Sequence, residues 1–326
     1  MGLEAFAQTI GHASTLLVDA QRGDRWIGVD YWYPAMNDGS PVTAYELLPG
    51  VAFAGEALTR PAPQPGPHPV ILLSHGWTGT RLIYSQICEA LAARGFVVIA
   101  GDHPGSTASD LFLGTLVDEE TNGRNRATDA QFLLDSVTGE RPGFDHGLQL
   151  NFEQLAMLGH SNGVATSLAF AADQAHGPKI RAVVGMEPYV RPVTVNQLER
   201  ITTPVLLLSG DKDLTTPTEL DLNYALAHIA TEFLMGLELA HCGHQGSSDV
   251  GLYIEQGPSV EGVPAGVLEF LDTMSADITG VAHEDWRPIL RTHVELIGAW
   301  LNEQFSRPAA NPSLSELLSR DGITQR

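Results

Sequence analysis

The hydrophobic residues of this chain gather in short continuous runs that are separated by stretches of helical spacing. Continuous runs between turn residues are typical of strands buried on both faces of a parallel sheet, and they occupy residues 70–74, 96–100, 155–158, 180–186, 204–210 and 232–237. Apolar residues at helical spacing occupy residues 82–94, 126–137, 164–170, 219–230, 263–274 and 287–305. The alternation predicts an α/β fold with a mainly parallel central sheet and helices on both faces.

The N-terminal part of the chain follows a different pattern. Residues 13–19 and 26–34 are apolar, β-branched and aromatic runs around a polar turn that contains glycine, which predicts an antiparallel hairpin at one edge of the sheet. Residues 39–69 are rich in proline, glycine and alanine. We expect them to form a surface loop with one short helix near residues 45–52.

Three further segments are expected to lie outside the central layers. Residues 106–125 are polar apart from one apolar patch and are interpreted as a mobile cover, and residues 306–326 as a loosely held tail. Residues 246–285 are interpreted as an acidic insertion that either shapes the site or covers the sheet. Because no stretch resembles an interdomain linker, residues 1–326 are interpreted as a single domain.

Composition narrows the class of protein. Hydrophobic residues make up 43% and charged residues 17% of the chain, as in ordinary soluble globular proteins, and no apolar run is long enough to cross a bilayer. The first five residues lack the basic start and apolar stretch of a secretory signal, so a chain that begins here is expected in the cytoplasm. Cys88 and Cys242 are interpreted as buried thiols rather than a disulfide, which suits a reducing compartment.

The net charge of −21 excludes functions that depend on neutralising nucleic-acid phosphates, and it argues against attraction to anionic membranes. The acidity is uneven, because no lysine or arginine occurs between Lys212 and Arg287. A solvated acidic surface is the favoured interpretation of this segment, and steering of substrates is the alternative.

The pentapeptide Gly159-His160-Ser161-Asn162-Gly163 lies between a predicted strand and a predicted helix. A flexible turn can carry the same residues by chance, but a strand, a sharp turn and a helix are the context of a G-x-S-x-G nucleophile elbow. The glycines leave room for neighbouring backbone. In that geometry the Ser161 hydroxyl is exposed as a nucleophile, and the backbone N–H of Asn162 points toward a developing oxyanion.

A serine becomes a nucleophile only when a base removes its proton and a third group orients that base. The expected chain order is serine, acid, histidine. Asp211 and Asp213 follow the clearest strand of the second half. Asp213 is preferred as the acid because it lies deeper in the loop, whereas Asp211 is expected to order the turn; the alternative is that both residues only form the turn.

Two histidines, His241 and His244, follow the last predicted core strand. His244 is preferred as the base, because Gly243 and Gly246 flank it where a loop must carry a side chain over the end of the sheet. His241 is expected to pack. A zinc site formed by these histidines and Cys242 is disfavoured, because no second ligand cluster has matching spacing.

An oxyanion hole needs a second N–H besides that of Asn162. Residues 75–77 follow an earlier central strand, so the backbone N–H of Trp77 is the candidate, and its indole is expected to form a wall for the acyl group. The alternative is that Trp77 is a partly buried loop residue without a catalytic part.

These motifs resemble those of the α/β-hydrolases, and specifically the bacterial relatives of platelet-activating-factor acetylhydrolase that are often labelled predicted dienelactone hydrolases. The resemblance implies Ser161, Asp213 and His244 as the catalytic triad, Trp77 and Asn162 as oxyanion donors, and no metal or organic cofactor. It rests on residues 29–34, 74–76, 102–106, 159–163, 210–213 and 243–249.

Cutinase-like polyester hydrolases resemble the chain more distantly, and this likeness implies that Trp77 and Tyr189 flank the scissile ester. Thr78 is also predicted to bind substrate. Two residues depart from the patterns. True dienelactone hydrolases use a cysteine where this chain has Ser161, and the polar Asn162 replaces a residue that is usually apolar.

The combined prediction is a serine hydrolase of carboxylic esters with short or medium acyl chains, acting through an acyl-enzyme. Neutral esters are favoured, because acidic residues around the site would repel carboxylate-bearing substrates, although Arg81 close after the oxyanion loop is able to reverse this locally. Hydrolysis of a polyester, lactone, amide or thioester, or acyl transfer, uses the same triad and stays an alternative. A non-catalytic scaffold that binds a ligand or partner is the alternative of another class.

Overall fold

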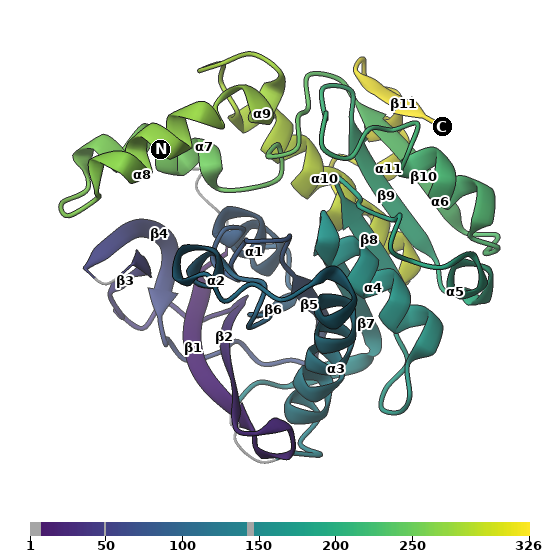
Figure 1. Cartoon of the computed structure of the whole chain (residues 1–326). Helices are drawn as coiled ribbons and strands as arrows, with labels where there is room; N and C mark the ends of the chain where they lie inside the picture. Colours follow the sequence, from purple (N-terminus) through teal and green to yellow (C-terminus); the bar gives the residue numbers. More distant parts are fainter. Residues whose placement is uncertain (1–7, 49, 142–146) are drawn as a thin grey trace.

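A sheet of eleven strands runs through the part of the chain that the computed structural model describes, residues 8–48, 50–141 and 147–326 (Figure 1). The first five residues, on which the expectation of a missing secretory signal rests, lie outside this part. The strands are β1 (Ile10–Asp19), β2 (Arg25–Pro34), β3 (Val42–Leu48), β4 (Val51–Thr59), β5 (His68–Ser74), β6 (Val97–Gly101), β7 (Leu150–His160), β8 (Ala182–Met186), β9 (Val205–Gly210), β10 (Leu234–Leu239) and β11 (Ile323–Gln325).

Helices connect and cover these strands. They are α1 (Ser85–Ala92), α2 (Ala108–Leu113), α3 (Glu119–Val137), α4 (Asn162–Asp173), α5 (Val195–Arg200), α6 (Leu222–His228), α7 (Val250–Gln256), α8 (Ala265–Thr273), α9 (Ala276–Thr279), α10 (Arg287–Gln304) and α11 (Leu314–Leu318), with short 3₁₀ helices at η1 (Ala20–Arg22) and η2 (Gly257–Ser259).

The predicted parallel strands are confirmed. Strands β5 to β10 pair in parallel in the order β10-β9-β8-β7-β5-β6. Helices cross over between them, so the carboxyl ends of these strands meet at one edge, where ligand sites of open α/β sheets are found.

The sheet continues beyond β6 in a way that the sequence pattern did not predict. The hairpin of β1 and β2 pairs through β2 with β6 and through β1 with β4, so it lies inside the sheet and not at its edge. The short helix predicted near residues 45–52 is wrong, because β3 and β4 form a second hairpin there. Its residues alternate between buried and exposed, for example buried Tyr45 beside exposed Glu46, which is the period of a strand.

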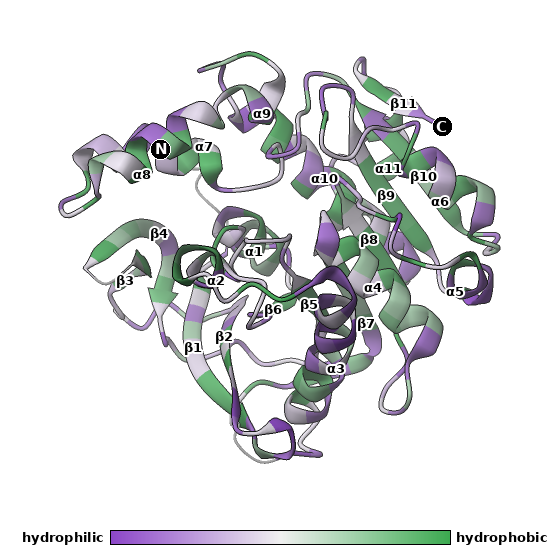
Figure 2. Cartoon of the chain, in the orientation of Figure 1, coloured by the Kyte–Doolittle hydropathy of each residue, from purple (hydrophilic) through white to green (hydrophobic). Residues whose placement is uncertain are grey.

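Side chains leave the sheet on alternate faces and build two separate cores. Along β5, Ile71 and Leu73 belong to the core under α1, α7, α10 and α11, whereas Val70 and Leu72 belong to the core under α3, α4, α5 and α6. In Figure 2 the strands of the sheet are mainly hydrophobic, and α3 changes from hydrophilic in its N-terminal half to hydrophobic near its end. The predicted cover of the sheet by helices on both faces is confirmed.

The C-terminal residues are fixed to the body of the molecule, so the prediction of a loose tail at residues 306–326 is wrong. Helix α11 begins with a capping box between Ser313 and Glu316 and buries Leu314 and Leu317. Strand β11 then pairs antiparallel with β10. Two buried leucines and three residues of extended chain were too short a pattern to predict this docking.

The acidic segment, residues 246–285, forms α7, η2, α8 and α9 and covers one side of the molecule near α1 and β4 (Figure 1). Tyr253 is buried beside Phe53 of β4, with ring centroids 4.7 Å apart, and the Asp249 carboxylate accepts hydrogen bonds from the first turn of α1, at Ser85 and Gln86. The segment therefore covers the sheet and α1, which was one of the two predicted roles.

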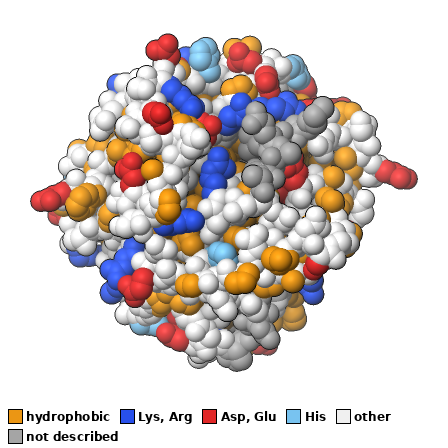
Figure 3. All heavy atoms as spheres, turned by 180° about the vertical axis from the view of Figure 1, so that it is seen from behind, with side chains coloured by type: hydrophobic (Ala, Val, Ile, Leu, Met, Phe, Trp, Pro, Cys, Tyr) orange, Lys and Arg blue, Asp and Glu red, His pale blue; other side chains and the backbone are white. Residues whose placement is uncertain are grey.

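Charge is distributed unevenly over the surface. On the face opposite to the view of Figure 1, lysine and arginine side chains lie across the centre and acidic ones toward the rim (Figure 3). Among the described helices, none combines the length and the apolar character needed to span a membrane. Cys88 and Cys242 are buried free thiols, as predicted.

Candidate active site

Ser161 lies at the turn between β7 and α4, with φ of 51° and ψ of −120°. Such a backbone is strained for a residue other than glycine, and the close packing of the turn holds it there. A Cβ at Gly163 would lie 2.0 Å from the carbonyl oxygen of Ser74, and a Cβ at Gly159 would lie 2.4 Å from the backbone of Gly163. Only glycine fits at these two positions, which is the physical content of the G-x-S-x-G pattern.

Ser161, His244 and Asp213 form a continuous chain of hydrogen bonds. His244 Nε2 lies 3.1 Å from Ser161 Oγ, and His244 Nδ1 lies 2.9 Å from Asp213 Oδ2. All three residues are buried. Because an ionised carboxylate only accepts hydrogen bonds, Nδ1 carries the proton, and Nε2 is left to accept the proton of Ser161.

The Asp213 carboxylate is fixed by its own loop. Its Oδ1 accepts hydrogen bonds from the N–H groups of Thr215 and Thr216, both at 2.8 Å, and its Oδ2 accepts one from the Thr216 hydroxyl at 2.5 Å. Burial acts to raise the pKa of Asp213, but the hydrogen bonds from His244 and Thr216 outweigh it and lower the pKa to about 2. Asp213 is therefore ionised at neutral pH.

Asp211 and His241, the alternative candidates for the acid and the base, lie away from Ser161. Asp211 is exposed, and its carboxylate accepts the N–H of Cys242 and pairs with Lys212 at 2.7 Å. His241 is exposed, with a positive φ of 56°. The expectation that it packs in the interior is therefore wrong. Asp213 and His244, which the sequence analysis preferred, are the two residues that the structure brings to Ser161.

The loop at residues 75–77 lies directly beside the elbow. A Cβ at Gly76 would lie 2.9 Å from His160 Nδ1 and 3.3 Å from Ser161 Cβ. In the described part of the chain, the backbone N–H groups of Trp77 and Asn162 donate to no other protein group. Unpaired N–H groups on both sides of a nucleophile are the donors that an oxyanion requires.

Arg126 of α3 holds this loop from behind. Its side chain is buried, with 1% of the residue exposed, and it donates to the carbonyl oxygens of His75 at 2.7 Å and Gly76 at 3.1 Å. Burial lowers the pKa of Arg126 to about 9. Because the peptide bond is planar and trans, a Gly76 carbonyl that points toward Arg126 directs the N–H of Trp77 the opposite way.

A second chain of hydrogen bonds joins this loop to the histidine loop through His160. The Gly76 N–H donates to the Tyr84 hydroxyl at 3.1 Å, and that hydroxyl lies 2.8 Å from His160 Nδ1. Burial and the nearby His244 lower the pKa of His160 to about 4, so the ring is neutral. Its Nε2–H donates to the carbonyl oxygen of His244 at 2.8 Å, which leaves Nδ1 to accept from Tyr84.

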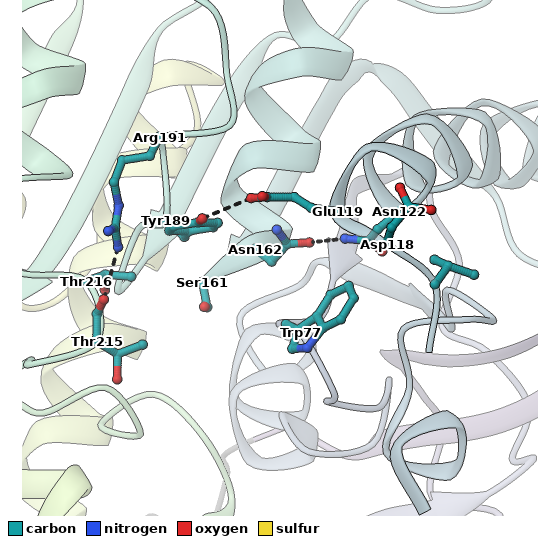
Figure 4. A pocket seen from close by; sticks show the side chains of 11 residues that line it. Trp77, Asp118, Glu119, Asn122, Ser161, Asn162, Tyr189, Arg191, Thr215 and Thr216 are labelled. Atoms are coloured by element: carbon teal, nitrogen blue, oxygen red, sulfur yellow. Dashed lines mark hydrogen bonds between the residues drawn. The ribbon is translucent and has the colours of Figure 1, made fainter. Parts of the chain in front are cut away.

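A pocket of about 510 Å³, here called the main pocket, opens at Ser161 (Figure 4). Trp77, which is 39% exposed, and Tyr189 both line it, whereas Thr78 does not and donates its hydroxyl to the carbonyl of Trp77. Residues 117–119 of the predicted cover also line it, and their movement stays a prediction. The lining residues are Trp77, Val117, Asp118, Glu119, Asn122, Ser161, Asn162, Tyr189, Arg191, Thr215 and Thr216.

Among the described residues, Glu187, Cys242 and His293 form a buried group with possible metal-ligand atoms close together. The His293 Nε2 lies 2.8 Å and the Cys242 Sγ 3.3 Å from Glu187 Oε1, and Ser247 donates to Oε2. Burial opposes both charges, but the mutual attraction lowers the pKa of Glu187 and raises that of His293. These contacts describe a hydrogen-bonded ion pair beneath the histidine loop.

The chain is similar in sequence to known acetylhydrolases and to a cutinase. The family model of platelet-activating factor acetylhydrolase, isoform II, matches residues 54–132. A cutinase, Est1 of Thermobifida alba, is 30% identical over 148 residues, which is 45% of this chain and 43% of the cutinase. The platelet-activating factor acetylhydrolase of Bos taurus is 28% identical over 187 residues, 44% of this chain and 40% of that enzyme. The chain thus spans less than half the length of these curated relatives.

A solved structure of a ferulic acid esterase from Streptomyces cinnamoneus superimposes with a TM-score of 0.72 over 98% of this chain and 97% of that chain, at 21% sequence identity. The chain has the α/β-hydrolase fold. The resemblance of the chain to acetylhydrolases and to a cutinase is also confirmed, over the stretches that match.

Several residues that support the site were missed in the sequence. Arg126 lies in a polar stretch where an exposed arginine is the ordinary expectation, and Tyr84 lies in the turn before α1. The Asn122 amide donates to Asn162 Oδ1 at 2.9 Å and joins α3 to the elbow. The start of α3 at Glu119 had a signal, since Asp118 and two following glutamates form an N-cap and an acidic first turn.

Proposed function

We propose that this chain is a serine hydrolase that cleaves carboxylic esters through an acyl-enzyme. The observation that carries the proposal is the hydrogen-bonded chain of Ser161, His244 and Asp213 beside the unpaired N–H groups of Trp77 and Asn162. The likeness to acetylhydrolases and a cutinase supports the same reaction class.

The reaction begins when His244 Nε2 removes the proton of Ser161 and Oγ attacks the ester carbonyl. The negative charge on the carbonyl oxygen is stabilised by the N–H groups of Trp77 and Asn162. Asp213 stabilises the imidazolium, which returns its proton to the departing alcohol. Water activated by His244 then attacks the acyl-enzyme and releases the acid.

Neutral esters are the proposed substrates. Asp118 and Glu119 line the main pocket, and Arg191, the one arginine among its described lining residues, is paired with the buried Asp221 at 3.2 Å. Arg81, which the sequence analysis named as a cation able to reverse the charge locally, is paired with Asp30 and Asp102 and is not among the described residues that line the pocket. A carboxylate on the substrate would therefore meet acidic side chains.

The decisive experiment measures hydrolysis of p-nitrophenyl esters from acetate to palmitate by the wild type and by Ser161→Ala. We expect the variant to lose roughly 10⁶-fold in kcat, and a fluorophosphonate to label the wild type only. Ser40→Ala, at a half-buried serine outside the main pocket, is the matched control and should behave as the wild type. Activity that survives in Ser161→Ala would refute the proposal.

The charge preference has its own test. Neutral esters should be hydrolysed faster than phthalate monoesters of the same alcohol at low salt, and the difference should shrink as salt screens the acidic side chains. Faster turnover of the monoesters would contradict the charge argument without affecting the assignment of Ser161.

A further inference from the structure

A second pocket, here called the side pocket, lies between α3, α4 and the chain after β8 and has a volume of about 280 Å³. Small or apolar residues such as Ala165, Ala169 and Val193 line it together with polar and charged residues of α3, among them Arg124 and Arg126. This is roughly twice the volume of an apolar cavity of ~150 Å³ that holds a benzene ring, so it suffices for a linear chain of about six to eight carbons.

The side pocket adjoins the main pocket. Glu119, Asn122 and Asn162 line both of them. Two hydrogen bonds frame the junction, one between the Asn122 and Asn162 amides at 2.9 Å and one from the Tyr189 hydroxyl to Glu119 at 3.0 Å. In the view of Figure 4, both of these hydrogen bonds lie above Ser161.

The position of His244 decides which half of an ester faces this junction. The leaving alcohol must lie on the His244 side of Ser161, because His244 Nε2 returns the proton to it. Thr215 and Thr216, whose N–H groups hold the Asp213 carboxylate, line the main pocket. The acyl group then extends in the other direction, toward Asn162 and Asn122.

We propose that the side pocket binds the acyl chain of medium-length esters, and that the pair of Tyr189 and Glu119 borders the passage into it. The inference rests on the proposed esterase function and adds the binding site of the acyl chain. Acetate fits within the main pocket, whereas a chain of six to eight carbons reaches between α3 and α4.

The test fills the side pocket from either wall. A Cβ at Gly123, which lines the pocket on α3, would meet no atom within 4 Å, so Gly123→Phe is tolerated by the fold. Ala169→Leu fills the pocket from α4 as the second variant. The matched control is Gly266→Phe on α8, because Gly266 is exposed, has equal space around its Cβ and lies outside both pockets.

The measured quantity is kcat/KM for p-nitrophenyl octanoate divided by that for p-nitrophenyl acetate in the same protein. We expect this ratio to fall at least about tenfold in Gly123→Phe and Ala169→Leu and to stay at the wild-type value in Gly266→Phe. An unchanged ratio in both pocket variants would overturn the inference. The inference would also be overturned if the pocket variants lost kcat/KM according to the length of the alcohol. This is measured with acetate esters of alcohols from ethanol to octanol.

The rate of p-nitrophenyl acetate hydrolysis distinguishes failure of the proposed function from failure of the proposed acyl site. If the wild type hydrolyses no ester in a manner that depends on Ser161, the proposed function fails. If acetate is hydrolysed but the chain-length ratio ignores both substitutions, only the acyl site fails.

Discussion

The two loops that meet at Ser161 are held in place by different chemistry. The histidine side is stabilised by an ionised carboxylate, Asp213, which lies within its own turn and contacts His244 directly. The oxyanion side is stabilised by a buried cation, Arg126, whose partners at His75 and Gly76 are uncharged carbonyls.

The difference follows from what each side does in the proposed reaction. His244 gains a positive charge in each step, so a fixed negative charge next to it lowers the energy of the charged state. The N–H of Trp77 never changes its charge and only has to stay in one orientation. A guanidinium that donates to several neutral acceptors fixes such an orientation without placing a negative charge near the oxyanion.

Removing the Asp213 carboxylate should cause the largest loss of kcat. We expect Asp213→Asn to lower kcat for p-nitrophenyl acetate about 10³- to 10⁴-fold, because the amide favours the wrong tautomer of His244. Asp211→Asn, two residues away and exposed, should change kcat less than about threefold. Equal losses in the two variants would contradict the assignment of Asp213.

Removing the Arg126 guanidinium should cause the second largest loss of kcat. Arg126→Met is expected to lower kcat about 10²-fold with little change in KM, because the donor at Trp77 loses its orientation, and Arg126→Lys should recover part of the loss. Labelling of Ser161 by a fluorophosphonate should slow in parallel. Arg181→Met, at an exposed arginine paired with Glu153, is the control, and an Arg126→Met variant with wild-type kcat would refute the orienting role.

The contribution of the Asp213 carboxylate to the free energy of unfolding should depend on pH. The pKa of Asp213 lies near 2 in the folded protein, below its value near 4 in an unfolded chain, so the ionised group stabilises the fold above pH 4 by about 2 kcal/mol. This contribution is lost as the pH falls from 4 through 2. Guanidinium chloride unfolding of the wild type and Asp213→Asn should show a difference that shrinks over this range, and a constant difference would contradict the argument.

Breaking the hydrogen-bonded connection between the two sides should cause the smallest loss of kcat. Tyr84→Phe removes the hydroxyl that links Gly76 to His160. We expect a loss of about 1 kcal/mol in unfolding free energy and a decrease in kcat of a few fold, since both loops keep their main partners. A loss of kcat as large as that of Arg126→Met would mean that the loops are held mainly through Tyr84 and not separately.

The sequence was most informative where one residue type is the only solution. Continuous apolar runs predicted β5 to β10, and Gly159 and Gly163 predicted the elbow, because backbone packs where a Cβ would lie. The preference for Asp213 over Asp211 came from its depth in a loop, and the structure places it at His244. The catalytic roles of these residues stay predictions.

The remaining features depend on distant contacts that no local pattern encodes. Arg126 contacts residues 75 and 76, about fifty positions earlier. The hairpin of β3 and β4 was masked by the proline- and glycine-rich composition around it. Strand β11 has only three residues, and its pairing with β10 is visible only once the sheet is assembled.

That short strand has a practical consequence. By pairing with Leu237 and Leu239, β11 covers an edge of the parallel sheet that would otherwise present unpaired N–H and C=O groups beside apolar side chains. Exposed edges of this kind recruit strands from other molecules. Expression variants shortened before residue 321 should therefore precipitate more readily than the whole chain, and an affinity tag is better separated from residues 323–325 by a flexible linker.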